Sequence, residues 1–314
     1  MSIDLPFVSV IVPVFNGERV IADCIESLLD QTYPKYEIIV VDNNSKDNTA
    51  KIVKQYPVKY LLENKIQSSY AARNKGIIHS KGDILAFIDA DCVASKEWLS
   101  EGIKPFIRPE VGCVAGEIVA YKPKERIERF FEKTNFFSVK RLLENYTFLP
   151  AAVTANVFYR RKVFELIGLF DSNTVTAGDI DFSWRMQLFT KYKIAPAEKA
   201  IVYHRHRKTY LSLFKQHKRY GYGMIYIDAR YRQFIVTFPI YKKIYWSLSK
   251  IFNKSLLCFL NFPKIVYSPD DFWKHFFDWV RYFGILCGEI HGFFDLKTNK
   301  LKVEPLKRDL RYNN

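Results

Sequence analysis

Apolar and polar positions follow two different rhythms over the first ninety residues. Three nearly continuous apolar runs occupy Val8–Val14, residues 36–41 and Ile84–Ile88, and apolar residues recur at helical spacing between them. Nearly continuous runs bounded by turn residues are typical of strands buried on both faces. Because a βαβαβ order favours right-handed crossovers, we predict an α/β fold with a mostly parallel, Rossmann-like sheet flanked by helices.

The second half of the chain changes its pattern. We expect an amphipathic helix over residues 126–143, one or two short strands within residues 193–204 and a long helix over residues 209–232. Beyond residue 234 the pattern loosens into aromatic segments interspersed with lysines. We therefore predict an α/β domain over residues 1–208 and a helical, aromatic-rich basic region over residues 209–314.

Composition permits a large core in a reducing compartment. Of the 314 residues 48% are hydrophobic, and five cysteines without paired spacing indicate buried, reduced thiols rather than a disulfide framework. Residues 1–4 lead directly into an expected strand, and no run of 18 apolar residues occurs. We expect a cytoplasmic protein without a secretion signal or a membrane-spanning helix.

Positive charge is concentrated at one end of the chain. Residues 201–314 carry 21 lysines and arginines against 8 acidic residues, whereas residues 1–200 carry 27 against 25. Within residues 272–283 aromatic side chains alternate with Lys274 and Arg281, which is typical of an interfacial helix. We predict peripheral attachment to an anionic membrane surface; the alternative is an aromatic helix packed on the α/β domain.

Acidic residues end two of the predicted strands. Asp42 follows the second strand, and Asp89-Ala90-Asp91 follows the strand Ile84–Ile88. Ligands bind outside the carboxyl ends of strands in such sheets. One or two carboxylates together with substrate phosphates suffice for Mg²⁺. Asp42 is suited to accept the imide N–H of a uracil ring, although Asp/Asn/Ser clusters also form ordinary turns.

Two helices bring further candidates. Arg73 lies near the apolar stripe of the helix after Ser69, where a diphosphate or a carboxylate would balance its charge, unless it is a surface arginine. Asp179 lies in the first turn of another helix, where the helix dipole favours an ionised carboxylate that can accept a proton. Asp181 precedes Arg185 by four residues, which favours an intrahelical ion pair.

Two histidines remain, in the sequence His204-Arg205-His206. A zinc hydrolase needs more ligands at defined spacing, and none follows. We expect His204 to be a third ligand of the cation held by Asp91, with a structural role as the alternative.

With these residues, the chain resembles the family 2 inverting glycosyltransferases of the GT-A fold. The resemblance covers about residues 7–206 and rests on an ordered set of motifs: Val8-Ser9-Val10-Ile11-Val12-Pro13-Val14-Phe15-Asn16, Val41-Asp42-Asn43-Asn44-Ser45-Lys46-Asp47-Asn48-Thr49, Ala72-Arg73-Asn74-Lys75-Gly76, Asp89-Ala90-Asp91 and Gly178-Asp179-Ile180-Asp181. It implies a GT-A fold, a role such as polysaccharide biosynthesis, a nucleotide-sugar donor with UDP favoured, and Mg²⁺ or Mn²⁺.

The resemblance also implies roles for the matching positions. The nucleotide-sugar would be bound by positions in the first four motifs: Pro13, Asn16, Asp42, Arg73, Asp89 and Ala90. Asp91 would be the direct metal ligand with help from His204, and Asp179 the general base for the acceptor hydroxyl. Many relatives have Glu-Asp where this chain has Gly178-Asp179, so Asp181 would inherit the role of base if the register differs by one turn.

The acceptor is expected to be a glycan or a lipid-linked sugar, bound by the second half of the chain. Trp184 and Asp181 are candidates for contacting the acceptor or supporting its site, although most aromatic residues here fit a core equally well. A nucleotidyltransferase or a dinucleotide oxidoreductase is disfavoured, because no glycine-rich loop follows the first strand. An inactive GT-A-like scaffold or an anionic-surface-binding protein is the alternative. Acidic strand ends would repel nucleic-acid phosphates, so we expect no nucleic-acid partner.

Overall fold

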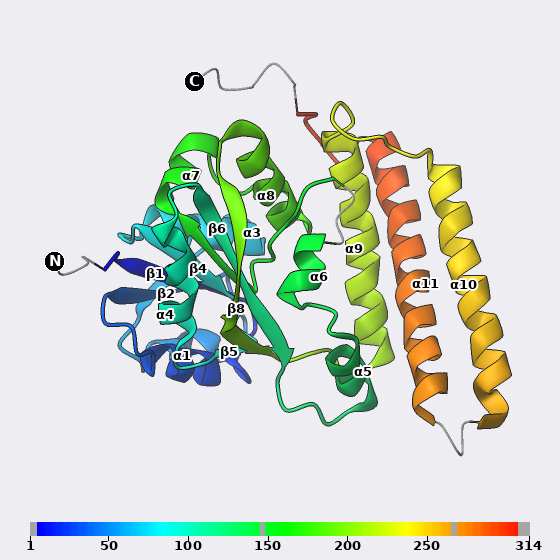
Figure 1. Cartoon of the computed structure of the whole chain (residues 1–314), viewed down its shortest axis with the longest axis horizontal. Helices are drawn as coiled ribbons and strands as arrows, with labels where there is room; N and C mark the ends of the chain where they lie inside the picture. The colour runs from blue at the N-terminus through cyan, green and yellow to red at the C-terminus, as the bar shows by residue number, and fades with distance from the viewer. Residues whose placement is uncertain (1–4, 145–147, 265–268, 307–314) are drawn as a thin grey trace.

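A mixed eight-stranded sheet forms the centre of the computed structural model, which describes residues 5–144, 148–264 and 269–306 (Figure 1). Its strands are β1 Val8–Val14, β2 Tyr36–Asp42, β3 Lys59–Leu62, β4 Ile84–Ile88, β5 Cys92–Ala94, β6 Val111–Ala120, β7 Asn156–Arg160 and β8 Lys193–His204. Their spatial order is β3-β2-β1-β4-β7-β6-β8-β5. The pairs among β3, β2, β1 and β4 are parallel, as predicted, whereas β7 is antiparallel to both of its neighbours.

Helices cover both faces of this sheet, because alternate side chains of each strand point to opposite faces. One core packs Val8, Val10 and Val12 against α1 (Ile21–Leu29) and α4 (Trp98–Ile103). The opposite core packs Ile11 and Phe87 against α3 (Ser69–Ile78), α7 (Arg161–Ile167) and α8 (Gly178–Phe189). The short helices are α2 (Thr49–Val53), η1 (Lys104–Ile107), α5 (Arg126–Thr134) and α6 (Val139–Glu144). This arrangement confirms the predicted fold class, with a sheet that is mixed rather than wholly parallel.

Three long helices form a separate layer beside the sheet: α9 (Tyr210–Arg230), α11 (Pro269–Lys297) and, outermost, α10 (Ile240–Asn261), which η2 (Phe262–Lys264) follows (Figure 1). Glycines let α9 and α11 approach closely. A Cβ at Gly288 would lie 2.0 Å from the carbonyl oxygen of Lys218, and one at Gly221 would lie 2.1 Å from that of Ile285. No helix in the described ranges is long and apolar enough to cross a bilayer.

The structure corrects the sequence analysis at three places. The helix expected over residues 126–143 is two helices, because Asn135 ends α5 in the left-handed conformation with φ of 44°. The short strands expected near residue 200 are one strand, β8, with register shifts. The expected interfacial segment, residues 272–283, lies in α11, where Phe277 and Val280 are buried against α5 and α9. This segment is the packed aromatic helix that was the alternative.

Candidate active site

A cleft of about 390 Å³ lies at the carboxyl ends of β4 and β8, between the α/β domain and α9. Five residues predicted from separate parts of the chain line it: Arg73, Asp89, Asp91, Asp179 and His204. The cleft is therefore the candidate active site.

Asp91 and His204 meet because β5 pairs with β8. This antiparallel pairing sets Cys92 opposite His204. The His204 imidazole therefore lies beside Asp91, the residue before Cys92, with Nε2 3.6 Å from the Asp91 carboxylate. The ligand atoms of Asp91, Cys92 and His204 all lie within 4.8 Å of one another. Burial, followed by the Asp91 charge, raises the pKa of the Cys92 thiol well above its usual value. An oxygen and an imidazole nitrogen are thus the donors best suited to a divalent cation here.

His206 supports this site without facing it. Its ring stacks on Phe131 with a centroid distance of 4.6 Å, and burial and the neighbouring charges of His204 and Arg207 lower its pKa to about 3. Its Nδ1 lies 3.2 Å from Nδ1 of His204. When His204 donates this hydrogen bond, its Nε2 carries the lone pair that a metal requires.

Arg73 is held at the bottom of the cleft by α3. Its side chain is only 4% exposed, and its Nη2 donates to Oδ1 of Asp89 at 2.5 Å. The guanidinium lies over the ring of Tyr70, 5.4 Å from the centroid. Its buried Nε has no hydrogen-bond partner within the described parts of the chain. A buried donor without a partner is costly, so Arg73 retains capacity for an anionic ligand.

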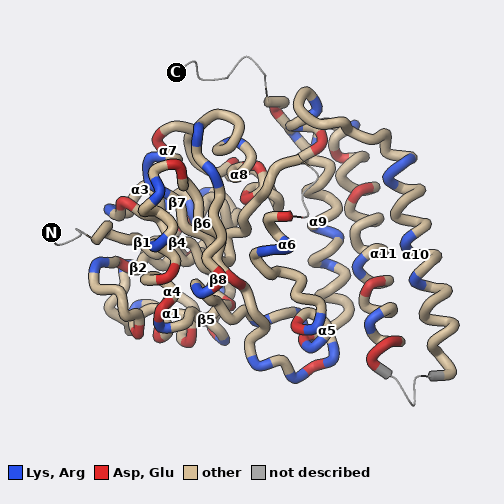
Figure 2. The backbone as a smooth tube through the Cα atoms, in the orientation of Figure 1, with Lys and Arg blue, Asp and Glu red and all other residues tan. Residues whose placement is uncertain are grey.

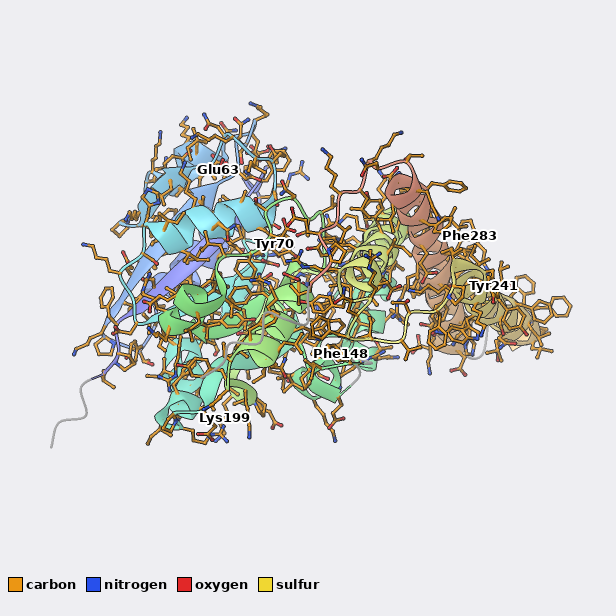
Figure 3. All side chains as sticks on the ribbon, turned by 90° about the horizontal axis from the view of Figure 1, so that it is seen from above. Glu63, Tyr70, Phe148, Lys199, Tyr241 and Phe283 are labelled. Carbon is orange, nitrogen blue, oxygen red and sulfur yellow. The ribbon has the colours of Figure 1, made fainter. Side chains whose placement is uncertain are left out.

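Asp179 opens α8 and is half-buried in the cleft wall. The Tyr70 hydroxyl accepts from the Gly178 N–H at 2.9 Å and donates to Oδ1 of Asp179 at 3.4 Å. Figure 3 labels Tyr70 where α3 meets the C-terminal half of the molecule. A Cβ at Gly178 would lie 2.8 Å from the Tyr70 ring, so this tyrosine takes the space of any side chain at position 178. Burial raises the pKa of Asp179, and the Arg73 charge opposes that rise.

Asp181 and Trp184 lie on α8, are buried and do not line the cleft. Asp181 is fully buried, and its carboxylate accepts from Arg185 Nε at 2.8 Å, Arg230 Nε at 2.5 Å and the Tyr231 hydroxyl at 2.9 Å. The predicted pair with Arg185 is confirmed, and the burial of Asp181 disfavours the alternative register that would make it the base. Trp184 is buried against Tyr231 and donates to the Leu149 carbonyl. Both residues link α8 to α9 and to the residue after it, and their contact with an acceptor stays a prediction.

The remaining predicted residues do not line the cleft. Asp42 is buried at the end of β2, where it accepts from the Ser45 N–H at 2.8 Å and the Tyr60 hydroxyl at 3.0 Å. Asn16 is exposed, and its Oδ1 accepts from the Lys46 N–H at 2.8 Å. Pro13 lies within β1 opposite Val41, and Ala90 is half-buried between the two aspartates. Their contacts with a nucleotide stay predictions.

Several cleft residues escaped the sequence analysis. Tyr70 is one, and the others are cationic: Arg141, Arg207 and Arg219. Burial raises the pKa of Tyr220 to about 12, and the charges of Arg219, Asp179 and Arg207 act on the same hydroxyl, so these groups converge. Neither Arg207 nor Arg219 has a carboxylate at ion-pair distance within residues 5–306 as described. The spacing of Gln216, Arg219 and Tyr220 on one helical face was the available signal.

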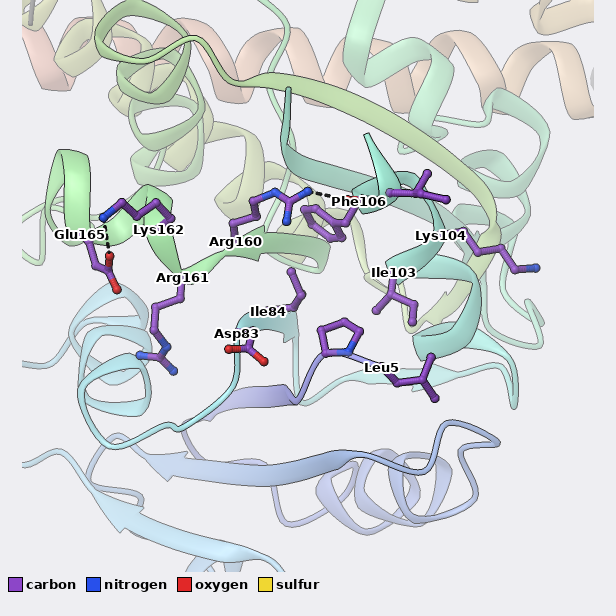
Figure 4. A pocket seen from close by; sticks show the side chains of 12 residues that line it. Leu5, Asp83, Ile84, Ile103, Lys104, Phe106, Arg160, Arg161, Lys162 and Glu165 are labelled. Atoms are coloured by element: carbon purple, nitrogen blue, oxygen red, sulfur yellow. Dashed lines mark hydrogen bonds and ion pairs between the residues drawn. The ribbon is translucent and has the colours of Figure 1, made fainter. Parts of the chain in front are cut away.

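A larger cavity, of about 790 Å³, lies at the opposite end of the sheet (Figure 4). Its charged groups are already engaged: Arg160 donates to the carbonyls of Val111 and Phe106, Arg161 to that of Gly82, and Lys162 pairs with Glu165. None of the predicted site residues lines it. The smaller cleft is therefore the better candidate.

Known proteins place this chain among sugar-transferring enzymes. The family model described as "Glycosyl transferase family 2" matches residues 9–168. The chain is 36% identical over 236 residues to "Glycosyltransferase AglE" of Haloferax volcanii, covering 72% of this chain and 76% of that protein. It is 27% identical, over 56% of this chain and 60% of the relative, to "Dolichyl N-acetyl-alpha-D-glucosaminyl phosphate 3-beta-D-2,3-diacetamido-2,3-dideoxy-beta-D-glucuronosyltransferase" of Methanococcus voltae.

A solved structure shares the fold. The mannosyltransferase PcManGT from Pyrobaculum calidifontis, in complex with GDP-Man and Mn²⁺, superposes with a TM-score of 0.66 at 18% identity. The superposition covers 92% of this chain and 88% of that one. The two chains therefore share the GT-A fold.

Proposed function

Because the chain belongs to glycosyl transferase family 2, we propose that it transfers a sugar from a nucleotide-sugar to a hydroxyl with inversion at the anomeric carbon. The single observation that carries this proposal is the convergence of Arg73, Asp89, Asp91, Asp179 and His204 on one cleft. Residues 1–208 would form the catalytic domain, and residues 209–314 would complete the acceptor side through α9.

Asp179 is proposed to accept the proton of the attacking hydroxyl. It lines the cleft and has a raised pKa, and the Tyr70 hydroxyl is the one side chain of the described residues that donates a hydrogen bond to it, at 3.4 Å. A base is most effective when its pKa lies near the working pH, and such catalysis contributes typically about 10²–10⁴-fold. Tyr70 would orient the carboxylate, because it also anchors the Gly178 N–H.

Asp91 and His204 are proposed to hold Mg²⁺ or Mn²⁺, with Asp89 contributing through Arg73, water or the donor ribose. A cation bound there would neutralise charge that develops on the departing nucleoside diphosphate. Arg73 would add to this effect because its guanidinium is buried and keeps one donor free. Ala90 would allow the backbone to approach the donor.

The donor is proposed to be a UDP-sugar, with Asp42, Asn16 and Pro13 shaping the base-binding end of the site. Family resemblance supports UDP, and the GDP-Man found in the Pyrobaculum enzyme makes GDP-sugars the first comparison. The acceptor is proposed to be a glycan or lipid-linked sugar. The name of the Methanococcus relative contains a dolichyl N-acetyl-alpha-D-glucosaminyl phosphate. Arg207 and Arg219 offer positive charge without a carboxylate partner among the described residues.

A lipid-linked acceptor would require access to a membrane. We include in the proposal a peripheral attachment to the inner face of the cell membrane through the basic region of residues 209–314. Its support is the excess of 21 basic over 8 acidic residues within residues 201–314. Polybasic surfaces are attracted to anionic lipid.

A thermal-shift panel tests the enzymatic proposal. UDP, GDP, dTDP and their sugars would be compared with and without Mn²⁺, on the full chain and on Asp91→Ala. We expect a metal-dependent rise in Tm with uridine nucleotides that Asp91→Ala abolishes. A shift with guanosine nucleotides alone would indicate a GDP-sugar donor instead of a UDP-sugar donor. No metal-dependent shift with any of them would contradict the proposal and favour an inactive scaffold or an anionic-surface-binding protein.

A further inference from the structure

The outer face of α10 is apolar although no part of the described structure covers it. Its inner side chains, such as Ile244, Ser247 and Ile251, pack on α11 and are buried or half-buried. On the opposite side a second stripe runs along the helix: Tyr241, Tyr245, Leu248, Phe252, Leu256 and Phe259. Steps of three and four residues place all six on one face of a helix.

This stripe is strongly exposed. Tyr245 and Phe252 are each 69% exposed, and Phe259 is 76% exposed. Val236 and Phe238 before α10 and Phe262 after it extend the surface at both ends. Figure 3 shows Tyr241 at the edge of the molecule farthest from the sheet. Contiguous apolar surface of this kind on a monomer marks a contact site with a protein or a membrane.

Charge decides between these two occupants. Residues 233–262 contain four lysines and no acidic residue, and Figure 2 shows no acidic position along α10. Lys243 and Lys254 pair internally with Asp228 and Asp278, and Lys250 lies over the Tyr282 ring of α11. Lys242 is exposed beside the stripe. A second copy of α10 would bring lysines against lysines, whereas anionic lipid headgroups would neutralise them.

We propose that α10 lies flat on an anionic bilayer and inserts this stripe among the headgroups and upper acyl chains. Tyr241 and Tyr245 suit that depth because their rings combine an apolar body with a polar atom. Lying flat is the mode open to a helix with one exposed apolar face and a lysine beside it. The proposal rests on the peripheral membrane attachment proposed above. It assigns that attachment to α10, and not to α11 or to the basic residues of the whole C-terminal region.

Co-sedimentation of the full chain with vesicles tests this assignment. The variant Tyr245→Ser/Phe252→Ser removes two exposed side chains, so the fold should persist, and an unchanged Tm checks this. The matched control, Ile78→Ser/Ile107→Ser, removes exposed apolar side chains of the α/β domain, 66% and 85% exposed. We expect the α10 variant to lose about tenfold or more in partitioning onto phosphatidylcholine–phosphatidylglycerol vesicles, and the control to bind like the wild type.

Other outcomes are equally informative. Lys242→Gln should weaken binding to the mixed vesicles but not to phosphatidylcholine alone. Equal binding by the wild type and the α10 variant, or no binding by the wild type, would overturn the assignment. So would a dimer in lipid-free sedimentation velocity that the α10 variant dissociates, because a second copy would then cover the stripe. Nucleotide binding is measured separately in the thermal-shift panel. A wrong assignment of the membrane-binding surface can therefore be distinguished from a wrong assignment of the enzymatic activity.

Discussion

The two ends of the central sheet hold two hollows of opposite character. At the amino end, the arginines of the larger cavity donate hydrogen bonds to backbone carbonyls: Arg160 to Val111 O at 2.8 Å, and Arg161 to Gly82 O at 2.6 Å. At the carboxyl end, the smaller cleft contains Arg73, whose buried Nε has no partner in the described structure. Arg207 and Arg219 likewise have no carboxylate within reach in the described ranges.

This difference shows that a binding site is marked by polar groups without a protein partner, and not by the volume of the cavity. A side chain that satisfies backbone carbonyls cannot be withdrawn for a ligand without leaving those acceptors unpaired. Parallel strands direct their carboxyl ends, and the loops that follow, to one rim, where ligands of such sheets bind. Substitutions in the cleft should therefore change activity more than matched substitutions outside it.

Asp179→Asn should have the largest effect. It keeps the shape of the proposed base but removes its ability to accept a proton, so kcat should fall by about 10²–10⁴-fold. Donor binding in the thermal-shift assay should change little, because the amide remains within reach of Tyr70. Steady-state transfer assays with the donor identified above measure the first quantity.

The matched control is Asp83→Asn at the other end of the sheet. Asp83 is exposed and accepts from the Phe7 N–H at 3.0 Å. Transfer activity should stay at the wild-type level in this variant. An Asp179→Asn enzyme that retained wild-type kcat would remove Asp179 from the mechanism.

Asp181→Asn should separate a structural carboxylate from a catalytic one on the same helix. The substitution leaves Arg185 and Arg230 buried around a neutral amide, and breaking such a pair costs about 3–5 kcal/mol. The free energy of unfolding in urea should fall by that amount. The protein that remains folded should keep its nucleotide-dependent Tm shift. Loss of kcat without loss of stability would instead give Asp181 the role assigned to Asp179.

Asp179 and Asp181 also show which features of the site can be predicted from the sequence. The spacing predicted the Asp181–Arg185 pair, and the apolar runs predicted the strands whose ends carry Asp89 and Asp91. Full burial of Asp181 depends on Arg230 and Tyr231, which arrive about fifty residues later from α9 and the residue after it. No local pattern encodes that contact, because it results from how α9 packs on α8.

In the helical layer, composition predicted the wrong exposed helix. The aromatic composition of residues 272–283 suggested an interfacial helix, yet glycines on α9 and α11 bring these helices together and bury one side of it. α10 has apolar residues on two sides, so neither its inner face nor its outer face is obvious from periodicity. Tertiary packing decides which of the two aromatic helices remains exposed.

Arg73→Lys should have an intermediate effect on transfer. A lysine keeps the charge but cannot reach Asp89, stack on Tyr70 and present a further donor at once. We expect kcat/KM to fall by about tenfold to a hundredfold, which corresponds to one or two charge-assisted hydrogen bonds. Arg161→Lys, at the amino end, should lower Tm slightly and leave kcat/KM unchanged. Equal loss of activity in both variants would mean that the two ends of the sheet do not differ as described.

The smallest effect concerns pH. Burial raises the pKa of Asp179, with the Arg73 charge opposing the rise, so the carboxylate becomes protonated at a higher pH than an ordinary aspartate does. As pH falls through that raised pKa, kcat/KM should decline about tenfold per unit, because only the ionised form accepts a proton. Ionisation also lowers stability as pH rises from the unfolded pKa to the folded one, because the folded protein holds the proton more tightly. Asp179→Asn should therefore unfold at the same or slightly higher urea concentration than the wild type at neutral pH, while Asp83→Asn should show neither change. A wild-type acidic limb at the pKa of a free aspartate, about 3.9, would contradict the burial of the proposed base.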